Sequence, residues 1–366
     1  MVNSLAGYEI FFSILALALG AVVGSFLNVC IYRLPLDLSV NKPRRSFCPS
    51  CRQQLTWWQN IPLLSWLFLR GKCAHCGARI GVRYFAVELL TALMFLCVWK
   101  AFPWQTAIAY WVFVSLLIAA TFIDFEHFII PDEITIGGTI AGIIACAIVP
   151  ELMNTASRWR AIATSALSAV LGYVLLWIVL ELGKKAFGKK RIQLDAPTPF
   201  SWTRKEDDAD FVVGDEQGLW SDYFARESDQ LILHCDEAIV GERNLGAADL
   251  RFHYDRVKFG EEELQLDSLD RISGIVRELQ IPREAMGRGD LKFLAAIGAF
   301  LGWRAVLFSV FAGSLVGSFV GLVTLVIGKR VWSAKLPFGP YLAFGGLVWM
   351  FFGDELVWWY LAQLNP

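Results

Sequence analysis

Hydrophobic residues gather in long runs separated by short polar stretches, a pattern typical of helices that cross a bilayer. Because each crossing needs roughly 20 apolar residues, we predict an all-α polytopic membrane protein with about eight transmembrane helices. Trp303 and Arg304 interrupt one run, and we expect the short piece before them to be a half-span that turns back into the next span. The predicted spans are residues 9–32, 84–102, 105–123, 134–150, 161–182, 291–302, 305–328 and 338–363.

One long polar stretch breaks this pattern between the fifth and sixth spans. Of the 34 acidic residues, 23 lie between Lys184 and Asp290, although only 18% of the whole chain is charged and 56% is hydrophobic. A soluble domain carries about 25% charged residues, so the composition excludes a soluble enzyme, a disordered protein and a secreted disulfide scaffold. The net charge of −1 gives no case for nucleic-acid binding.

The acidic stretch has the pattern of a folded module. The runs Asp229–Val240 and Leu250–Leu266 mix charged, apolar and β-branched residues, which favours strands. We therefore predict a small, mixed or mostly β cytoplasmic insert. Its first part, residues 195–228, is rich in Asp, Pro and Gly and is expected to be loop.

Lysine and arginine indicate the orientation of the spans. The loop 33–83 holds nine of them against one acid, Asp37, and should be cytoplasmic. Alternation then makes 124–133, 184–290 and 329–337 cytoplasmic and both termini periplasmic. Residues 1–8 lack Lys and Arg, so we expect the first span to be a retained anchor.

These patterns divide the chain into five predicted segments. They are residues 1–32, the first transmembrane helix; 33–83, a cytoplasmic four-cysteine loop; 84–183, helices two to five; 184–286, the acidic insert; and 287–366, helices six to eight.

Four of the eight cysteines form two CxxC pairs in the first cytoplasmic loop, separated by 21 residues. Two such pairs are typical of a tetrahedral zinc site, and a reducing cytoplasm disfavours disulfides. Four protein thiolates leave no open position, so we predict a structural Zn²⁺ that folds a loop with little core of its own. Redox-active cysteines are the alternative. The predicted ligands are Cys48, Cys51, Cys73 and Cys76.

Two carboxylates stand where predicted spans meet the cytoplasm. Asp124 ends the third span, and Asp290 opens the sixth within Gly287-Arg288-Gly289-Asp290. A carboxylate at the membrane boundary is by default a functional hypothesis. Two acids at one membrane face suit an aspartyl hydrolase, in which one ionised carboxylate takes a proton from water while a protonated one polarises the scissile carbonyl. Alternatively, Asp290 is a helix cap and Asp124 a solvated acid.

Several neighbours are candidate supporting residues. Gly287 and Gly289 allow a sharp bend or close approach of the backbone. Lys292 could snorkel or bias a nearby carboxylate toward its ionised form, and Asp132 reads first as the N-cap of the fourth span. Glu126 and the adjacent histidine are either solvated or supporting.

The chain resembles the bacterial type IV prepilin peptidases, also called leader peptidase/N-methyltransferases. The matching pieces are Gly24-Ser25-Phe26-Leu27-Asn28-Val29 with Arg33-Leu34-Pro35, the four-cysteine loop, Asp124 with Pro131-Asp132, and Gly287–Lys292. The resemblance covers nearly all of the membrane body. It departs in one respect: many members have only a short link where this chain carries its acidic insert.

The resemblance implies an inner-membrane aspartic endopeptidase of bacteria. Such enzymes cut the leader of prepilins and pseudopilins, the substrates of type IV pili and type II secretion, on the cytoplasmic side after a glycine. Asp124 and Asp290 fall on the family's catalytic aspartates. Bacterial members then methylate the new N-terminus with S-adenosyl-L-methionine, an activity associated with the cysteine loop, so the methyl-donor site is expected near residues 33–83.

Two other functions remain open. Another GxGD intramembrane aspartyl protease typically carries a Tyr-Asp pair, whereas Ile123 precedes Asp124 here. A non-catalytic scaffold or transporter with a zinc-stabilised loop would place its acids at mid-membrane. Neither matches the sequence as well as the prepilin peptidases do.

Overall fold

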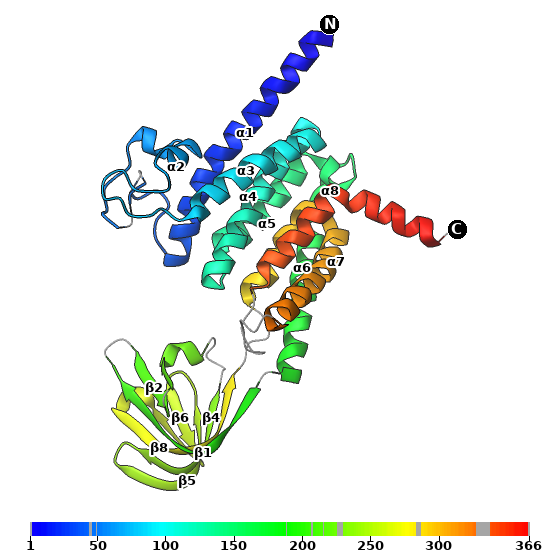
Figure 1. Ribbon diagram of the computed structural model, residues 1–366. Coiled ribbons are helices and arrows are strands. Elements are labelled where there is room, and N and C mark those ends of the chain that lie inside the picture. The colour runs from blue at the N-terminus through cyan, green and yellow to red at the C-terminus, as the bar shows by residue number, and fades with distance from the viewer. Residues whose placement is uncertain are drawn as a thin grey trace. The chain divides into compact units, whose positions relative to one another are not determined.

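The chain divides into two compact units, Met1–Trp177 with Gly287–Pro366, and Ile178–Met286 (Figure 1). The first is helical and the second is built of strands. The computed structural model describes residues 2–43, 46–48, 50–187, 189–205, 208–214, 216–224, 230–282, 287–326 and 337–364. Most of the predicted loop 329–337 therefore lies outside the described residues.

Long helices form most of the first unit. Among the described residues, five helices are long and apolar enough to cross a membrane: α1, α3, α4, α6 and α7. The expectation of a polytopic helical membrane protein is confirmed, whereas the count of eight spans stays a prediction. The helices are α1 (Val2–Arg33), η1 (Leu34–Leu36), η2 (Trp57–Asn60), α2 (Leu64–Phe68), α3 (Val82–Ala101), α4 (Trp104–His127), α5 (Asp132–Ile148), η3 (Pro150–Met153), α6 (Arg158–Phe187), α7 (Arg288–Val326) and α8 (Gly339–Leu364).

Small residues let the helices pack closely. A Cβ atom on Gly24 of α1 would lie 2.7 Å from the Cα atom of Glu88 in α3, and one on Gly142 of α5 would lie 2.8 Å from the Cβ atom of Ala299 in α7. Close approach of backbones is how helices gain packing energy in a bilayer, where association has little hydrophobic driving force. Gly24, which begins one of the sequence motifs, therefore fixes the contact between α1 and α3.

Helix α7 reverses direction within its length. Gly302 has non-helical angles, φ 82° and ψ 175°, and a Cβ atom on Gly298 would lie 2.8 Å from Cγ2 of Val306. Residues eight apart in a straight helix are separated by about 12 Å, so the two halves fold against each other. This agrees with the half-span predicted from the interruption at Trp303 and Arg304.

The second unit is one antiparallel sheet with strand order β3-β2-β1-β8-β4-β5-β6-β7. Its core holds large buried rings, among them Phe211, Trp220 and Phe252. The prediction of a β insert is confirmed. The strands are β1 (Lys189–Arg204), β2 (Ala209–Val213), β3 (Glu216–Leu219), β4 (Leu231–Val240), β5 (Arg243–Phe252), β6 (Arg256–Phe259), β7 (Glu262–Gln265) and β8 (Arg271–Pro282), with η4 (Trp220–Tyr223) and η5 (Leu266–Ser268) between them.

The loop expected at residues 195–228 is wrong for most of the part that is described, because most of β1 and all of β2 and β3 lie there. The register between β1 and β8 shifts between Gln193 and Thr198, so the bulge takes up the Asp-Ala-Pro segment that suggested a loop. Beyond it, Phe200 and Trp202 are buried in the core on alternate positions. This short alternation was hidden by the polar residues around it.

Candidate functional sites

The two predicted catalytic aspartates are both buried. Asp124 lies in the last turns of α4 and Asp290 in the first turn of α7, and their relative exposures are 5% and 7%. Their charges act on each other. Buried carboxylates without a cationic partner are costly in any protein, and this cost makes the pair a candidate functional site.

Ile130 lies between the helix ends that carry the pair. A Cβ atom on Gly289 would lie 3.2 Å from Cβ of Ile130, and one on Gly339, at the start of α8, would lie 2.9 Å from Cδ1 of the same side chain. The Gly339 Cβ atom would also lie only 2.7 Å from Oδ2 of Asp124. Ile130 thus contacts the first turns of both α7 and α8, and neither glycine leaves room for a side chain.

Backbone N–H groups hold both carboxylates. Gly339 N–H donates to Oδ2 of Asp124 over 2.9 Å, and Gly287 N–H donates to the Asp290 carboxylate. Asp290 is the third residue of its helix and bonds back to the N-cap residue, as in half of a capping box. The alternative of a helix cap is therefore realised, but in a buried position beside a second acid. Sequence reasoning missed Gly339, which no motif signals.

Three of the supporting residues form ion pairs. Nζ of Lys292 lies 2.6 Å from Oδ1 of Asp132, and Arg83 forms an ion pair with Glu126. Asp132 is not the N-cap that the sequence suggested, because Pro131 occupies that position and makes no side-chain bond. The pair between Lys292 and Asp132 links the start of α5 to α7, two residues after Asp290.

The four loop cysteines converge. Their sulfur atoms all lie within 4.8 Å of one another, and Zn–S bonds of about 2.3 Å in a tetrahedron require sulfurs about 3.8 Å apart. Each pair sits in the same turn: Arg52 N–H donates to the Cys48 carbonyl over 2.8 Å, and Gly77 N–H to the Cys73 carbonyl over 2.9 Å. Both residues are left-handed, with φ 57° and 70°. The loop therefore presents two equivalent knuckles that fit one metal ion.

Electrostatics within the cluster favour a bound cation. Backbone N–H groups of Cys76 and His75 lower the pKa of Cys73 to about 6. The pKa of Cys76 rises to about 11, despite a bond from the Ala78 N–H, because of burial and the neighbouring sulfurs. Four adjacent thiols cannot all ionise against one another, whereas a divalent ion would allow all four thiolates to form.

A cavity of about 260 Å³ lies between α1, α3 and the cysteine loop. Arg33, 4% exposed, closes one side by donating to the carbonyls of Ser39, Val40 and Pro43. Sequence analysis gave no role to Asn28 or to Glu88, which also line this cavity. The available signal was Glu88, an acid inside a predicted span.

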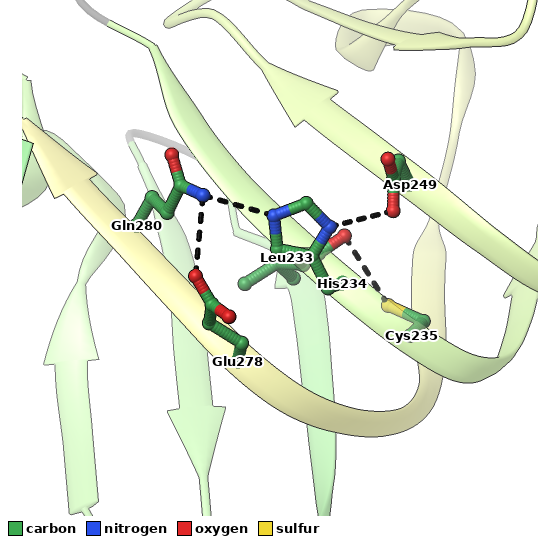
Figure 2. Close-up of polar contacts among 6 residues, drawn as sticks. All are labelled: Leu233, His234, Cys235, Asp249, Glu278 and Gln280. Atoms are coloured by element: carbon green, nitrogen blue, oxygen red, sulfur yellow. Dashed lines mark hydrogen bonds and ion pairs between the residues drawn. The ribbon is translucent and has the colours of Figure 1, made fainter. Parts of the chain in front are cut away.

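The β unit carries a polar network across three strands (Figure 2). Asp249 lies 2.7 Å from Nδ1 of His234, and Nε2 of Gln280 lies 3.0 Å from Nε2 of the same ring and 3.3 Å from Glu278. Because the side-chain nitrogen of Gln280 can only donate, His234 accepts at Nε2 and donates from Nδ1 to Asp249. Both ring nitrogens are thus engaged in joining β5, β4 and β8. Beside it, burial and the charges of two aspartates raise the pKa of Cys235 to about 12.

Comparison with known proteins matches both halves of the helical unit. Residues 18–102 match the bacterial peptidase A24 N-terminal domain, and residues 111–192 and 273–322 match the type IV leader peptidase family. The chain belongs to the type IV leader peptidase family. The interval between the matched segments of the leader peptidase domain, residues 193–272, falls inside the β unit.

Three curated proteins similar to this leader peptidase family member share one name. Prepilin leader peptidase/N-methyltransferase of Aeromonas hydrophila is 28% identical over 93% of this chain and 91% of the relative. The Legionella pneumophila protein of that name is 26% identical over 99% of both chains, and the one from Myxococcus xanthus is 41% identical over 52% of this chain and 55% of the relative. No solved structure matches the chain significantly.

Proposed function

We propose that this protein is a bifunctional prepilin leader peptidase and N-methyltransferase of the bacterial inner membrane. It cuts the leader of type IV prepilins or pseudopilins after a glycine, on the cytoplasmic side, and methylates the new N-terminus. The observation that carries the proposal is the buried aspartate pair, found in a chain whose relatives are named for these two activities. The same relatives favour it over another intramembrane protease and over a transporter.

In the proposed cleavage, Asp124 and Asp290 share the chemistry. One carboxylate, ionised, removes a proton from the attacking water. The other, protonated, donates to the oxygen of the scissile carbonyl as the water adds. The C–N bond then breaks, and the carboxylate that took the proton from water returns it to the leaving amine. Backbone N–H groups from Gly339 and Gly287 orient the two carboxylates, and pre-orientation lowers the reorganisation that the reaction requires.

Replacing either aspartate tests the cleavage. Asp124→Asn and Asp290→Asn should each lose nearly as much activity as the double variant, because groups that act as a unit give non-additive losses. The measurement is cleavage of a prepilin by purified enzyme in detergent, with Asp354→Asn, an exposed acid of α8, as the control. Substantial cleavage by a folded Asp124→Asn variant would reject the assignment.

The cysteine cluster is proposed to hold one structural Zn²⁺. Bound there, zinc would neutralise the thiolates and fix the two knuckles, and the loop would gain from it the stability that its small core lacks. Metal analysis of the purified protein should find about one zinc per chain. Cys48→Ser should lower that content, whereas Cys97→Ser, which removes an exposed thiol elsewhere, should not.

The β insert is proposed to be a separable module outside the catalytic machinery. The hydrophobic core of the insert consists of its own residues. The first residue of its first strand, Lys189 of β1, pairs with the last residue of its last strand, Pro282 of β8. Replacing residues 195–280 with a short flexible linker should preserve cleavage of a short leader peptide. Complete loss in a protein that still inserts and binds zinc would place the insert within the active site.

A further inference from the structure

The cavity under the cysteine loop is separate from the aspartate pair. Neither Asp124 nor Asp290 lines its 260 Å³, and its walls come from α1, α3 and the loop. The lining residues that bear on its chemistry are Ser25, Asn28, Tyr32, Trp66, Tyr84 and Glu88. They combine aromatic faces with acceptors, and this set suits a ligand that is partly flat and carries positive charge.

The side-chain oxygen of Asn28 is a buried hydrogen-bond acceptor to which no described group donates. Its side chain is only 3% exposed. Its Nδ2 donates to the Tyr84 carbonyl over 2.9 Å, which fixes the orientation of the amide, since a carbonyl can only accept. Oδ1 then has no partner within the described part of the chain. Buried carbonyl oxygens are nearly always bonded, so this atom points to a donor that arrives with a ligand.

Glu88 is the one carboxylic acid among the described residues that line the cavity. The carboxylate is held by the Leu63 N–H over 2.7 Å and by the Ser25 side chain. Two donors leave about half of its acceptor sites open. Of the cationic lining residues, Arg33 is directed into loop carbonyls and Arg79 is exposed.

Aromatic rings supply the rest of the wall. Trp66, Tyr32 and Tyr84 line the cavity, and Trp66 is fixed by a bond from Nε1 to the Ile80 carbonyl and by packing on Phe85. Such faces stack on a purine and attract a cation. An adenosyl sulfonium carries both a purine and a cationic sulfur. It also carries an ammonium group, whose N–H bonds can donate to Oδ1 of Asn28.

We propose that this cavity binds the methyl donor, with Asn28 accepting from the ligand's N–H groups and Glu88 facing its positive charge. The assignment rests on the proposed methyltransferase function. In the transfer it serves, the neutral N-terminal amine of the cleaved substrate forms a bond to the methyl carbon as the carbon–sulfur bond breaks. The electron pair of that bond stays on sulfur, leaving a neutral thioether, and the methylated amine releases its proton to water.

The test measures binding of S-adenosylmethionine and S-adenosylhomocysteine to the full-length protein in detergent, by calorimetry. Asn28→Ala should weaken both ligands at least tenfold. Glu88→Gln should weaken the sulfonium by about tenfold and the neutral thioether much less, so the preference between them falls. Glu151→Gln, which removes an exposed acid of η3, is the matched control and should bind like the wild type.

Cleavage of a prepilin and zinc content report on folding, and both should be retained in each variant. Should Asn28→Ala fail to fold, the near-isosteric Glu88→Gln variant still decides the question. A wild type that binds and methylates, with variants that bind equally well, would overturn this assignment and leave the proposed function intact. A wild type that neither binds nor methylates would overturn both. Displacement of the donor by a peptide with a free N-terminal amine would make the cavity the acceptor site and also overturn the assignment.

Discussion

Gly339→Ala tests whether the position of the Asp124 carboxylate determines the rate of cleavage, independently of the stability of the fold. The added Cβ atom would lie 2.7 Å from Oδ2 of Asp124 and 2.9 Å from Cδ1 of Ile130. Ordinary contacts of a Cβ atom begin at 3.4 Å, so the carboxylate must retreat by about 0.7 Å. The retreat also strains the bond from the Gly339 N–H to this carboxylate.

The magnitude follows from the required alignment of reacting groups. A misplacement of 1 Å can cost about 100-fold in rate, so we expect kcat for prepilin cleavage to fall by roughly 10- to 100-fold. Gly346→Ala on the same helix is the matched control, because its Cβ atom would meet nothing closer than 3.5 Å. It should cleave at the wild-type rate and gain a little stability from helix propensity.

The assay follows cleavage of a purified prepilin by gel shift, with thermal unfolding of each variant measured alongside. Methylation of a pre-cleaved peptide gives a second readout, and it should be spared if the two activities use different sites. A Gly339→Ala enzyme with wild-type kcat and an unchanged unfolding temperature would refute the reasoning, since the displaced carboxylate would then not matter for the reaction.

Three further outcomes follow from local geometry. Gly77→Val should lower zinc retention, because a β-branched residue at φ 70° costs about 1–2 kcal/mol, whereas Arg52→Gly in the equivalent turn should retain zinc at least as well; metal analysis during dialysis against a chelator measures both. Gly274→Ala should destabilise the β unit by about 3 kcal/mol or more, because its Cβ atom would lie 2.1 Å from the Glu237 carbonyl oxygen; wild-type protease resistance of this unit would contradict that. Cys235, with a pKa of about 12, should react with iodoacetamide at pH 8 roughly a thousandfold more slowly than a free thiol, and rapid labelling of the folded protein would show that its burial is wrong.

Prediction from the sequence succeeded best where a pattern of residue types is compatible with few structures. Two CxxC pairs at fixed spacing predicted the converging sulfurs, and the apolar runs predicted the membrane helices. The reversal at Gly302 was likewise signalled by the polar interruption beside it. In each case the pattern is local, so no knowledge of distant contacts was needed.

Contacts between distant segments could not be predicted from the sequence. Gly339 lies 215 residues from Asp124, to which it donates, and a single glycine at the start of an apolar run carries no signal of that partner. Asn28 was visible within a motif, but its unpaired oxygen depends on the position of the Tyr84 carbonyl in another helix. The strands of residues 195–228 were missed because a bulge tolerates Pro and Asp where an unbroken ladder would not.

The pairing of Lys189 with Pro282 has an evolutionary consequence. Antiparallel partners lie about 5 Å apart at their Cα atoms, so the chain enters and leaves the sheet at neighbouring points. Insertion or deletion of this domain therefore requires little change in the flanking helices, because a few residues can span the distance between the two points. Lineages could exchange domains at this point, or dispense with one, while the aspartate that follows keeps its place.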